Sequence, residues 1–489
     1  MSRINRRTFL TGAAAASGAM LLPHSQVLGA NEDIRVAVVG FNGRGMGHIS
    51  EVLAAPGARL VALCDLDPAV LARGVKAAEQ GGAKVQTYTD VRKLLESKEI
   101  DAITTATPNH WHSLIGIWAC QAGKDAYVEK PISHNLWEGR QLVKAARKYN
   151  RIVAGGTQSR SNPKLHQAVA WVRGGNLGKI KAVYGYCYKP RLSIGKTGKG
   201  EVPSGLDYDM WIGPAEMKPL SRKNLHYDWH WVYNTGNGDM GNQGIHQMDI
   251  ARWFLGANEL SPRVMSVGGR LGYDDDGETP NTQVVYHDYA GAPLIFETRG
   301  LPRGKEFHDP KVWSSHMDSP DGFGGKGGIG VTVECEGGKV CNVGDSVTAY
   351  YTQGKVIRTF EGEGPRPGHM ANFINAVRER KSEMLAAEVL ETHLSSGLCH
   401  TGLISHRLGK KQSNGEIRER IQGNRLAAER FDAMREHLER NGVSLDSDRV
   451  TLGPWLTFDP KRERFEDHKE ANAMLTRTYR APYTVPAKP

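Results

Sequence analysis

The chain has 489 residues, of which 39% are hydrophobic and 24% charged, and its formal net charge is +10. A chain of this length exceeds one hydrophobic core and predicts two or three domains. The positive charge would suit a nucleic-acid partner. However, the basic residues are spread along the chain, and no recognition helix, zinc-finger spacing or RNA-binding motif accompanies them. We therefore expect a soluble basic protein with no nucleic-acid partner.

Residues 1–30 have the pattern of an export signal. Arg6 and Arg7 precede a mildly apolar run over 13–22, and a small residue, Ala30, ends the segment. The run is too short to span a bilayer. Paired arginines before such a run predict a twin-arginine signal, the twin-arginine export machinery as a partner, and a periplasmic or otherwise exported location. The alternative is an ordinary basic N-terminal helix.

Residues 31–157 alternate between short apolar runs and helical stretches. The expected strands are 34–39, 59–64, 84–88, 101–106, 125–128 and 151–154, and the expected helices are 68–80, 91–98, 111–122 and 136–149. Such alternation predicts a parallel sheet with helices on both faces. Six strands in about 120 residues is the size of a dinucleotide-binding Rossmann domain.

After residue 157 the strand-like runs lengthen, which predicts a second α/β domain over 158–408 with a large, mainly antiparallel open sheet. The expected strands lie in the runs 179–188, 263–271, 281–289, 293–299, 329–335 and 348–360, with tight turns such as Gly337-Gly338 and Gly354-Lys355 separating some of them. The expected helices are 163–174, 242–255, 368–380 and 387–408. Residues 409–489 form a charged extension, which we expect to be helical at first and to run along the surface from 450 onward.

The first expected strand runs into the sequence VVGFNGRGMGH, which opens a helix. Gly40, Gly43 and Gly45 lie in this turn, with Asn42 at the second position of the usual G-x-G-x-x-G fingerprint. Asn tolerates unusual backbone angles better than most residues. A phosphate can still rest on the amides at the helix N-terminus. The alternative is a glycine turn in another kind of α/β sheet.

Asp65 ends the second expected strand, 20 residues after Gly45, where an acid binds the ribose hydroxyls of a dinucleotide. A carboxylate there favours NAD over NADP. Arg44, inside the glycine turn, could instead meet a 2′-phosphate, so NADP stays possible.

Polar residues follow the fourth and fifth expected strands. In an open parallel sheet, ligands bind at the carboxyl ends of strands. We therefore expect these side chains to face the cofactor: Thr107, Pro108, Asn109 and His112 of TPNHWH, and Glu129 and Lys130 of EKP.

The segment GDMGNQGIHQMD, 238–249, places Asn242, His246 and Asp249 at positions i, i+4 and i+7 of an expected helix. These positions share one face. The face is either a buried hydrogen-bond network or part of a reaction centre, and spacing alone favours the network.

The glycine turn, TPNHWH, EKP and G-x-H-x-x-D occur in an order that resembles the Gfo/Idh/MocA family, the glucose-fructose oxidoreductase and inositol dehydrogenase group, over about residues 33–408. The resemblance implies a Rossmann domain, an open-sheet α/β domain and a homo-oligomer, either a dimer or a tetramer. It implies NAD(P)-dependent oxidation or reduction of a sugar or cyclitol.

The same resemblance implies that Lys130 lies beside the nicotinamide and that His246 is an acid/base. The family's aspartate four residues before this histidine is Asn242 here. An amide can hold a hydroxyl or orient an imidazole but cannot take a proton. We retain Lys130, His246 and Asn242 as the expected catalytic set.

Residues 226–243 are rich in aromatic side chains. Trp229, Trp231 and Tyr233 could stack on a sugar ring, and Asp249 could orient it, so these four are the expected substrate residues. The alternative is that the rings pack in a core and that Asp249 is structural. His226, Asp228 and His230 could ligate a metal on an extended segment, but no further ligand pattern supports this, and we expect no metal site.

The chain has six cysteines, and no two are spaced as CxxC. Cys335 and Cys341 flank the turn Gly337-Gly338 and could face each other on a hairpin. Export would permit a disulfide between them. Buried free thiols are the expectation for the others.

The sequence thus predicts an exported NAD(P)-dependent oxidoreductase that transfers a hydride to or from a hydroxyl or carbonyl carbon of a sugar, cyclitol or glycoside. Tightly bound cofactor is expected, because free nicotinamide is scarce outside the cell. One alternative is an NAD-dependent glycosidase acting by transient oxidation and elimination, which ranks second because GNQGIHQMD differs from the motif of glycoside-cleaving members. The other is a non-catalytic sugar- or cofactor-binding protein.

Overall fold

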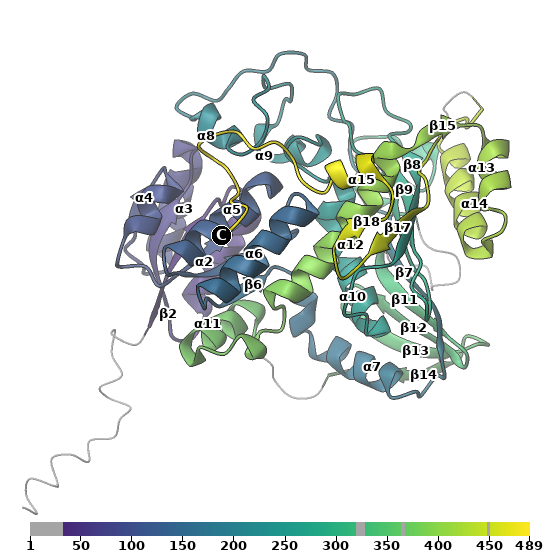
Figure 1. Cartoon of the computed structure of the whole chain (residues 1–489), viewed down its shortest axis with the longest axis horizontal. Helices are drawn as coiled ribbons and strands as arrows, with labels where there is room; N and C mark the ends of the chain where they lie inside the picture. The colour runs from purple at the N-terminus through teal and green to yellow at the C-terminus, as the bar shows by residue number, and fades with distance from the viewer. Residues whose placement is uncertain (1–32, 319–327, 363–366, 447–449) are drawn as a thin grey trace, which may run out of the picture.

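The computed structural model describes residues 33–318, 328–362, 367–446 and 450–489 (Figure 1). The predicted export signal lies outside these residues. Within them, two α/β units lie side by side, and the C-terminal tail returns to the first (Figure 1). No helix in the described ranges is long and apolar enough to cross a membrane.

The first unit contains a six-stranded parallel sheet with strand order β3-β2-β1-β4-β5-β6. Its strands are β1 (Ile34–Val39), β2 (Ala58–Cys64), β3 (Gln86–Tyr88), β4 (Ala102–Thr105), β5 (Asp125–Val128) and β6 (Val153–Gly155). Its helices are α2 (Arg44–Ala54), α3 (Pro68–Gln80), α4 (Val91–Glu96), α5 (Asn109–Gln121) and α6 (Leu136–Lys148). The strand order reverses between β1 and β4, which is where ligands bind in such sheets. The predicted Rossmann domain is confirmed.

The helix boundaries follow local capping. Asp67 accepts the backbone N–H groups of Ala69 and Val70 and is followed by Pro68 in the first turn of α3. Asn135 caps α6 by accepting the N–H of Glu138. These caps satisfy amides that would otherwise lack partners, so each helix starts directly after its strand-end loop.

The second unit contains a 12-stranded sheet, whose main path is β14-β13-β12-β11-β7-β10-β9-β8-β16-β15. Its strands are β7 (Ile180–Cys187), β8 (Arg263–Gly269), β9 (Thr282–His287), β10 (Leu294–Arg299), β11 (Ile329–Cys335), β12 (Gly338–Val343), β13 (Ser346–Tyr351), β14 (Val356–Thr359), β15 (Lys410–Gln412), β16 (Val450–Leu452), β17 (Leu456–Asp459) and β18 (Arg464–Phe465). Of the described pairings, β7 with β10 is parallel and the others are antiparallel. This confirms the predicted mainly antiparallel sheet.

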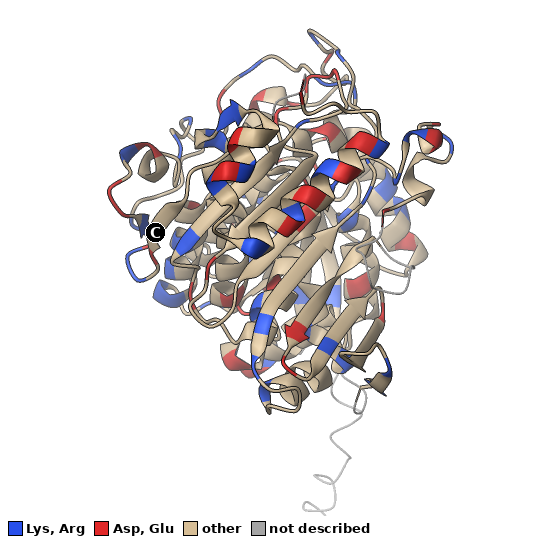
Figure 2. Cartoon of the chain, turned by 90° about the vertical axis from the view of Figure 1, so that its right-hand side faces the viewer, with Lys and Arg blue, Asp and Glu red and all other residues tan. Residues whose placement is uncertain are grey.

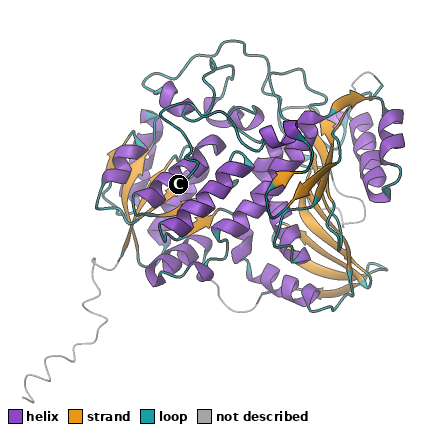
Figure 3. Ribbon diagram, viewed as in Figure 1, coloured by secondary structure: helices purple, strands orange, loops and turns teal. Residues whose placement is uncertain are grey.

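Helices cover both faces of this sheet (Figure 3). Helices α7 (Pro163–Arg173), α10 (Ile245–Leu255) and α12 (Val389–Leu408) bury one face in the largest hydrophobic core. Helices α13 (Asn414–Ile421) and α14 (Arg425–Arg440) form a separate core with β8, β9 and β10 on the other face. Figure 2 views this side and shows charged residues of both signs along α14. Helix α11 (His369–Glu379) packs against the Rossmann sheet instead.

The run 348–360 forms two strands, β13 and β14, separated at the expected turn Gly354-Lys355, where Gly354 has φ +83°. Two other elements differ from the sequence-based expectation. The expected helix 242–255 begins as a π-helical turn, Met240–Gly244, and continues as α10. The border expected at residue 408 falls inside the sheet, since β15, β16 and β17 extend it.

The C-terminal tail crosses from the second unit to the Rossmann domain. After α15 (Lys469–Ala473), the carbonyl of Leu475 accepts the N–H of Trp137, and Tyr483 and Val485 join the Rossmann core. Tyr483 contacts Trp111 edge-on at 5.4 Å between ring centres. The tail therefore braces the Rossmann domain.

All six cysteines are buried free thiols. In the hairpin of β11 and β12, Cys341 lies opposite Thr332, whereas Cys335 lies opposite Gly338. The expected facing of Cys335 and Cys341 is therefore wrong, because the tight turn at Gly337-Gly338 sets a register that keeps them apart.

Candidate active site

A cavity of about 320 Å³ lies at the carboxyl ends of the Rossmann strands. All but one of the residues predicted to bind cofactor line it: Gly40, Asn42, Gly43, Arg44, Asp65, Thr107, Pro108, Asn109, His112, Glu129 and Lys130. Gly45, the remaining one, lies in the first turn of α2 directly behind the loop. The sequence motifs thus converge on one place, as the strand-end argument predicted.

The glycine turn is shaped for close approach. Gly40 has φ +72°, and a Cβ there would lie 2.6 Å from Cγ2 of Thr107. A Cβ on Gly45 would lie 2.2 Å from the carbonyl oxygen of Gly40. Gly43 caps α2 without a side-chain hydrogen bond, which leaves the first amides of the helix available to an anion. The turn therefore fits a diphosphate despite Asn42.

Asp65 is fixed at the end of β2 by two backbone amides. Its carboxylate accepts the N–H of Phe41 and the N–H of Asp67, each at 3.0 Å. Burial raises the pKa of Asp65, and these two hydrogen bonds act in the opposite direction. The side chain has acceptor capacity left for ribose hydroxyls.

Arg44 is held by carboxylates. Its guanidinium pairs with Glu51 at 2.8 Å and with Glu129 at 2.9 Å. Arg73, the other arginine at the turn, donates to Oδ1 of Asn42 at 2.5 Å. The two carboxylates neutralise Arg44, and the carboxylate of Asp65 lies at the ribose position, so the geometry favours NAD over a 2′-phosphorylated cofactor.

Glu129 is buried at the end of β5 and anchors the loop that follows. Its Oε1 accepts hydrogen bonds from Arg44, His48 and Gln158 at 2.8–3.1 Å. Burial alone would raise the pKa of Glu129, but the hydrogen bond and charge of His48, with Lys130 and Arg44, hold it well below its usual value. His112 bridges the same loops, with its ring nitrogens 2.6 Å from the carbonyls of Pro131 and Thr107. Both residues position Lys130.

Lys130 reaches from the Rossmann domain to the second unit. Its Nζ donates to the backbone carbonyl of Asn242 at 2.6 Å. Burial lowers the pKa of Lys130 from its ordinary 10.5, and Arg44 and Arg191 lower it further. The buried ammonium therefore gives up its proton more readily than an exposed lysine.

His246 lies one turn beyond Asn242, in the first turn of α10. Burial and the nearby charge of Lys130 lower the pKa of His246 to about 3. The imidazole is therefore neutral at physiological pH and can accept a hydrogen bond or a proton. Asn242 lines the cavity, and its amide lies 3.4 Å from Oδ1 of Asp239.

His230 is a residue of this site that the sequence argument did not select. Its ring stacks on Trp229 at 3.6 Å and lines the same cavity as Lys130 and Asn242. Nδ1 lies 2.6 Å from the carbonyl of Tyr227, which can only accept, so Nδ1 carries the proton and Nε2 keeps a free lone pair. Burial lowers the pKa of His230 to about 3. The signal in the sequence was a histidine between two tryptophans.

The four expected substrate residues separate in the structure. Trp229 lines the cofactor cavity, whereas Trp231 is 4% exposed and Tyr233 lines a different cavity. The segment forms helical turns, α9 (Leu225–Asp228) and the 3-10 turn Trp229–Trp231, so its alternate residues do not share a side. The extended geometry that a metal site here would need is therefore absent from this segment.

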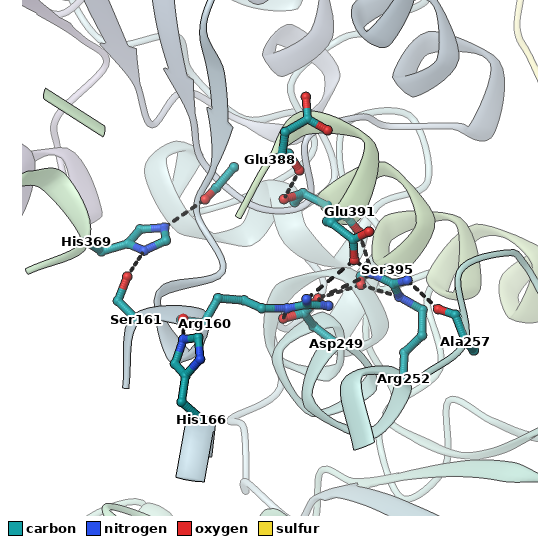
Figure 4. A network of polar contacts seen from close by, with 12 residues as sticks. Arg160, Ser161, His166, Asp249, Arg252, Ala257, His369, Glu388, Glu391 and Ser395 are labelled. Carbon is teal, nitrogen blue, oxygen red and sulfur yellow. Dashed lines mark hydrogen bonds and ion pairs between the residues drawn. The ribbon is translucent and has the colours of Figure 1, made fainter. Parts of the chain in front are cut away.

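Asp249 lies in a buried ion pair (Figure 4). Both its oxygens accept from Arg160 at 2.9 Å, and Ser395 donates to Oδ1 at 2.6 Å. Arg252 and Glu391 complete the network with a contact of 2.6 Å. The network joins α10 to α12 and to the 3-10 turn Gln158–Ser161, and the assignment of Asp249 to substrate is corrected to a structural one.

Two family models match this chain. Residues 34–157 match the Gfo/Idh/MocA model described as an oxidoreductase family with an NAD-binding Rossmann fold. Residues 175–308 match the model of the C-terminal alpha/beta domain of the same oxidoreductase family. The chain belongs to the Gfo/Idh/MocA family. The cavity therefore lies in the domain that matches this NAD-binding Rossmann model.

Curated relatives of this Gfo/Idh/MocA chain include glycosyl hydrolase family 109 proteins. One from Shewanella woodyi is 36% identical over 118 residues, 23% of this chain and 25% of the relative. Another, protein 1 from Shewanella sp. strain MR-4, is 31% identical over 173 residues, 30% of this chain and 38% of the relative. The matched regions therefore span about a quarter to two-fifths of the relatives' length.

Solved structures share the fold over most of the chain. The WlbA dehydrogenase from Bordetella pertussis, in complex with NADH and UDP-GlcNAcA, aligns with a TM-score of 0.55 and 20% identity, covering 77% of this chain and 97% of that one. A levoglucosan dehydrogenase in complex with NADH and levoglucosan aligns with a TM-score of 0.53 and 18% identity, covering 76% and 96%. At these identities the likeness concerns the fold.

Proposed function

We propose that this protein is an exported NAD-dependent oxidoreductase that transfers a hydride to or from a hydroxyl-bearing carbon of a carbohydrate. The observation that carries the proposal is the position of Lys130. Its ammonium lies in the same cavity as the glycine turn and Asp65, and it reaches across to Asn242 of the second unit. A proton-transfer group is thus placed where the two units meet beside the nucleotide site.

The residues present fit a nicotinamide dinucleotide. A Cβ at Gly40 or Gly45 would fill the cradle beside α2, and the buried Oδ1 of Asn109 lacks a partner within the described structure. Gly43 and Arg44 would hold the diphosphate end and Asp65 a ribose. When bound, NAD supplies the hydride acceptor or donor. Side chains of this protein must then bind the substrate and transfer the hydroxyl proton.

Those side chains handle the hydroxyl proton. Oxidation of a secondary alcohol needs a base within hydrogen-bond reach of the hydroxyl. Lys130, in its neutral form, and the free Nε2 of His230 both line the cavity. We assign the proton to Lys130 and the orientation of the hydroxyl to His230, with His246 as a neutral neighbour that accepts a hydrogen bond. Trp229, whose ring stacks on His230 at 3.6 Å, holds that imidazole in place at the cavity.

A covering segment supports tight retention of the cofactor. Leu206, Met210 and Trp211, from the region of α8 (Tyr208–Ile212), line the cavity together with the glycine turn. His226 bonds Asp67 at 2.8 Å and so closes the segment onto the Rossmann domain next to Asp65. The C-terminal tail holds α8 from outside, because Arg480 pairs with Asp209 at 2.6 Å. An enzyme that binds NAD before export by the twin-arginine machinery would need such closure, because free nicotinamide is scarce outside the cell.

A second candidate is glycoside cleavage without net consumption of NAD, favoured by the 30–36% identity to glycosyl hydrolase family 109 proteins over parts of the chain. Transient oxidation of one sugar carbon would acidify the neighbouring C–H. A base would then take that proton as the glycosidic oxygen leaves, water would add to the resulting double bond, and the hydride would return. These reaction steps require two proton-transfer groups, and Lys130 and His230 provide them.

The experiment is to purify the exported protein and identify its bound nucleotide by mass spectrometry. A panel of sugars, cyclitols and aryl glycosides is then offered to the protein. Net formation of NADH with a sugar identifies the dehydrogenase, whereas release of the aryl group with no net change in NADH identifies the glycosidase. Protein with neither bound nicotinamide nor affinity for it would refute both.

Binding of NAD and sugar without turnover would identify a non-catalytic binding protein. Cell fractionation of the full chain and of an Arg6→Lys, Arg7→Lys variant tests export, which should fail in the variant. Light scattering tests the expected dimer or tetramer.

A further inference from the structure

A second cavity, of about 610 Å³, lies where the C-terminal tail meets α12 and the loop after the 3-10 turn Trp229–Trp231. It shares no lining residue with the cofactor cavity. Leu403, Ile404 and Met474 give it an apolar wall, and Tyr233 adds an aromatic ring. Its size and mixed lining suit an organic molecule.

Arg477 of the tail lines this cavity. The hydrogen-bond acceptors around its guanidinium carry no negative charge. Its guanidinium donates to the backbone oxygen of Asn234 at 2.9 Å, to Oδ1 of Asn234 at 2.6 Å and to Nδ1 of His134 at 3.2 Å. All three acceptors are neutral. Burial lowers the pKa of Arg477, which is the sign of a cation in a poorly solvated place.

Arg407, in the last turn of α12, supplies a second cation. Its guanidinium lies 4.8 Å from the centre of the Tyr233 ring. Among the described residues, no carboxylate lies within ion-pair distance of Arg407 or Arg477. The charge of Arg407 also lowers the pKa of Arg477, so the two arginines act on each other across the cavity.

The acidic residues nearby have partners of their own. Glu216 and Glu278 line the cavity themselves; Glu216 pairs with Lys218 at 3.0 Å, and Glu278 accepts the N–H of Tyr233 at 2.7 Å. Glu138, behind the cavity wall, accepts from Asn135 and Tyr479 at 2.7 and 3.0 Å. None of these carboxylates lies within ion-pair distance of Arg407 or Arg477 among the described residues, so both guanidinium groups keep N–H donors for an added anion.

We propose that this cavity binds a small organic oxyanion whose carboxylate or phosphate group is held between Arg407 and Arg477. A guanidinium matches the paired oxygens of either group with two parallel N–H···O bonds. Such an anion would offset the repulsion between the two like charges. It would also tie the tail to α12. The site does not depend on the proposed function, since it lies apart from the cofactor cavity.

The test measures binding to the full exported protein by calorimetry, in chloride buffer and with saturating NAD so that the nucleotide cavity is occupied. The probes are D-glucuronate, glucose 6-phosphate and the neutral control glucose. We expect at least one of the two anions to bind more tightly than glucose. The anion that binds identifies the group as carboxylate or phosphate.

The variant Arg407→Ala should weaken that binding about tenfold or more, because it removes a charge-assisted contact. Arg407 is exposed at the rim, so the variant should fold as the parent does. If Arg407→Ala does not fold, Arg407→Gln, which keeps most of the aliphatic side chain, is used instead. The matched control Arg462→Ala removes another exposed arginine, 83% accessible, and should leave binding unchanged.

Two results would overturn the proposal. One is that neither anion binds more tightly than glucose. The other is that Arg407→Ala and Arg462→Ala bind the anions as tightly as the parent protein, which would place the anions elsewhere on the molecule.

Discussion

The ammonium of Lys130 donates to the backbone carbonyl of Asn242 at 2.6 Å, and this contact joins the end of β5 to the π-helical turn that precedes α10. Asn242 thus acts on the lysine through its main chain. Its side-chain amide points instead to Asp239, a buried carboxylate already paired with Arg191 at 2.8 Å. An acid at position 242 would place two carboxylates together, which an amide avoids.

Asn242→Asp should therefore slow the enzyme at neutral pH. A new carboxylate near Lys130 stabilises the ammonium and raises its pKa, typically by about one unit or more. The fraction of neutral lysine, and with it the rate of alcohol oxidation, should fall about tenfold for each unit. The measurement is the pH profile of kcat/KM for both proteins. A variant that is faster at neutral pH would show that the family's usual acid was the missing group.

Lys130→Met should abolish turnover while sparing cofactor binding. The loss should be about 10²–10⁴-fold in kcat, the range for removing a positioned acid or base. Glu129 keeps Arg44, His48 and Gln158 as partners, so the loop should stay in place. NAD affinity by calorimetry is the control, and turnover that survives with intact NAD binding would contradict the assigned role.

The pH profile itself should distinguish the lysine from the histidines. The pKa of Lys130 is lowered from 10.5, so kcat/KM for oxidation should rise with pH through a limb below that value. The pKa values of His230 and His246 are lowered to about 3, so both stay neutral between pH 5 and 9 and add no limb there. His230→Gln should keep the limb and lower the rate. A limb that disappears in His230→Gln would transfer the base role to the histidine.

Much of the nucleotide site followed from the sequence because parallel strands bring their carboxyl ends to one edge. Gly40, Asp65 and Lys130 are far apart in the chain, yet each follows a buried strand, and that alone places them together. The Rossmann strands and their helices were predictable for the same reason, since their apolar runs and caps are local signals.

The second half of the site was less predictable because its geometry depends on contacts between distant segments. His230 lies in a helical turn rather than on a strand, and Arg160, which pairs with Asp249, is 89 residues away in the sequence. The i, i+4, i+7 spacing suggested one face, but the π-helical turn ends before His246 and separates Asn242 from the regular helix.

His226→Ala should speed the release of NAD. His226 bonds Asp67 at 2.8 Å and closes the covering segment beside the ribose site. Asp67 also caps α3 by accepting two backbone amides, so the helix should persist without the histidine. Loss of one charge-assisted hydrogen bond should raise the dissociation rate about tenfold. Stopped-flow displacement of bound NADH measures it, with Arg462→Ala, at an exposed position, as the control.

Asp249→Asn should destabilise the protein and leave the KM for substrate nearly unchanged. The carboxylate is 1% exposed and joins Arg160 through two hydrogen bonds of 2.9 Å. Breaking a buried ion pair by removing one partner costs about 3–5 kcal/mol, and Glu391, 3.4 Å from Arg160, should keep the loss near the lower limit. Denaturant unfolding with bound NAD measures the change.

The matched control is Asp345→Asn, which removes an exposed partner of Lys164 at 2.8 Å and should cost less than about 1 kcal/mol. The pKa of Asp249 is lowered, because the charge and hydrogen bonds of Arg160 outweigh the burial that alone would raise it. Its contribution is therefore present above the unfolded pKa of about 3.9 and is lost as pH falls through the folded value. The stability that Asp249→Asn loses near neutral pH should therefore shrink and vanish as the pH becomes strongly acid. If KM rises sharply in Asp249→Asn while stability is unchanged, the carboxylate contacts substrate after all.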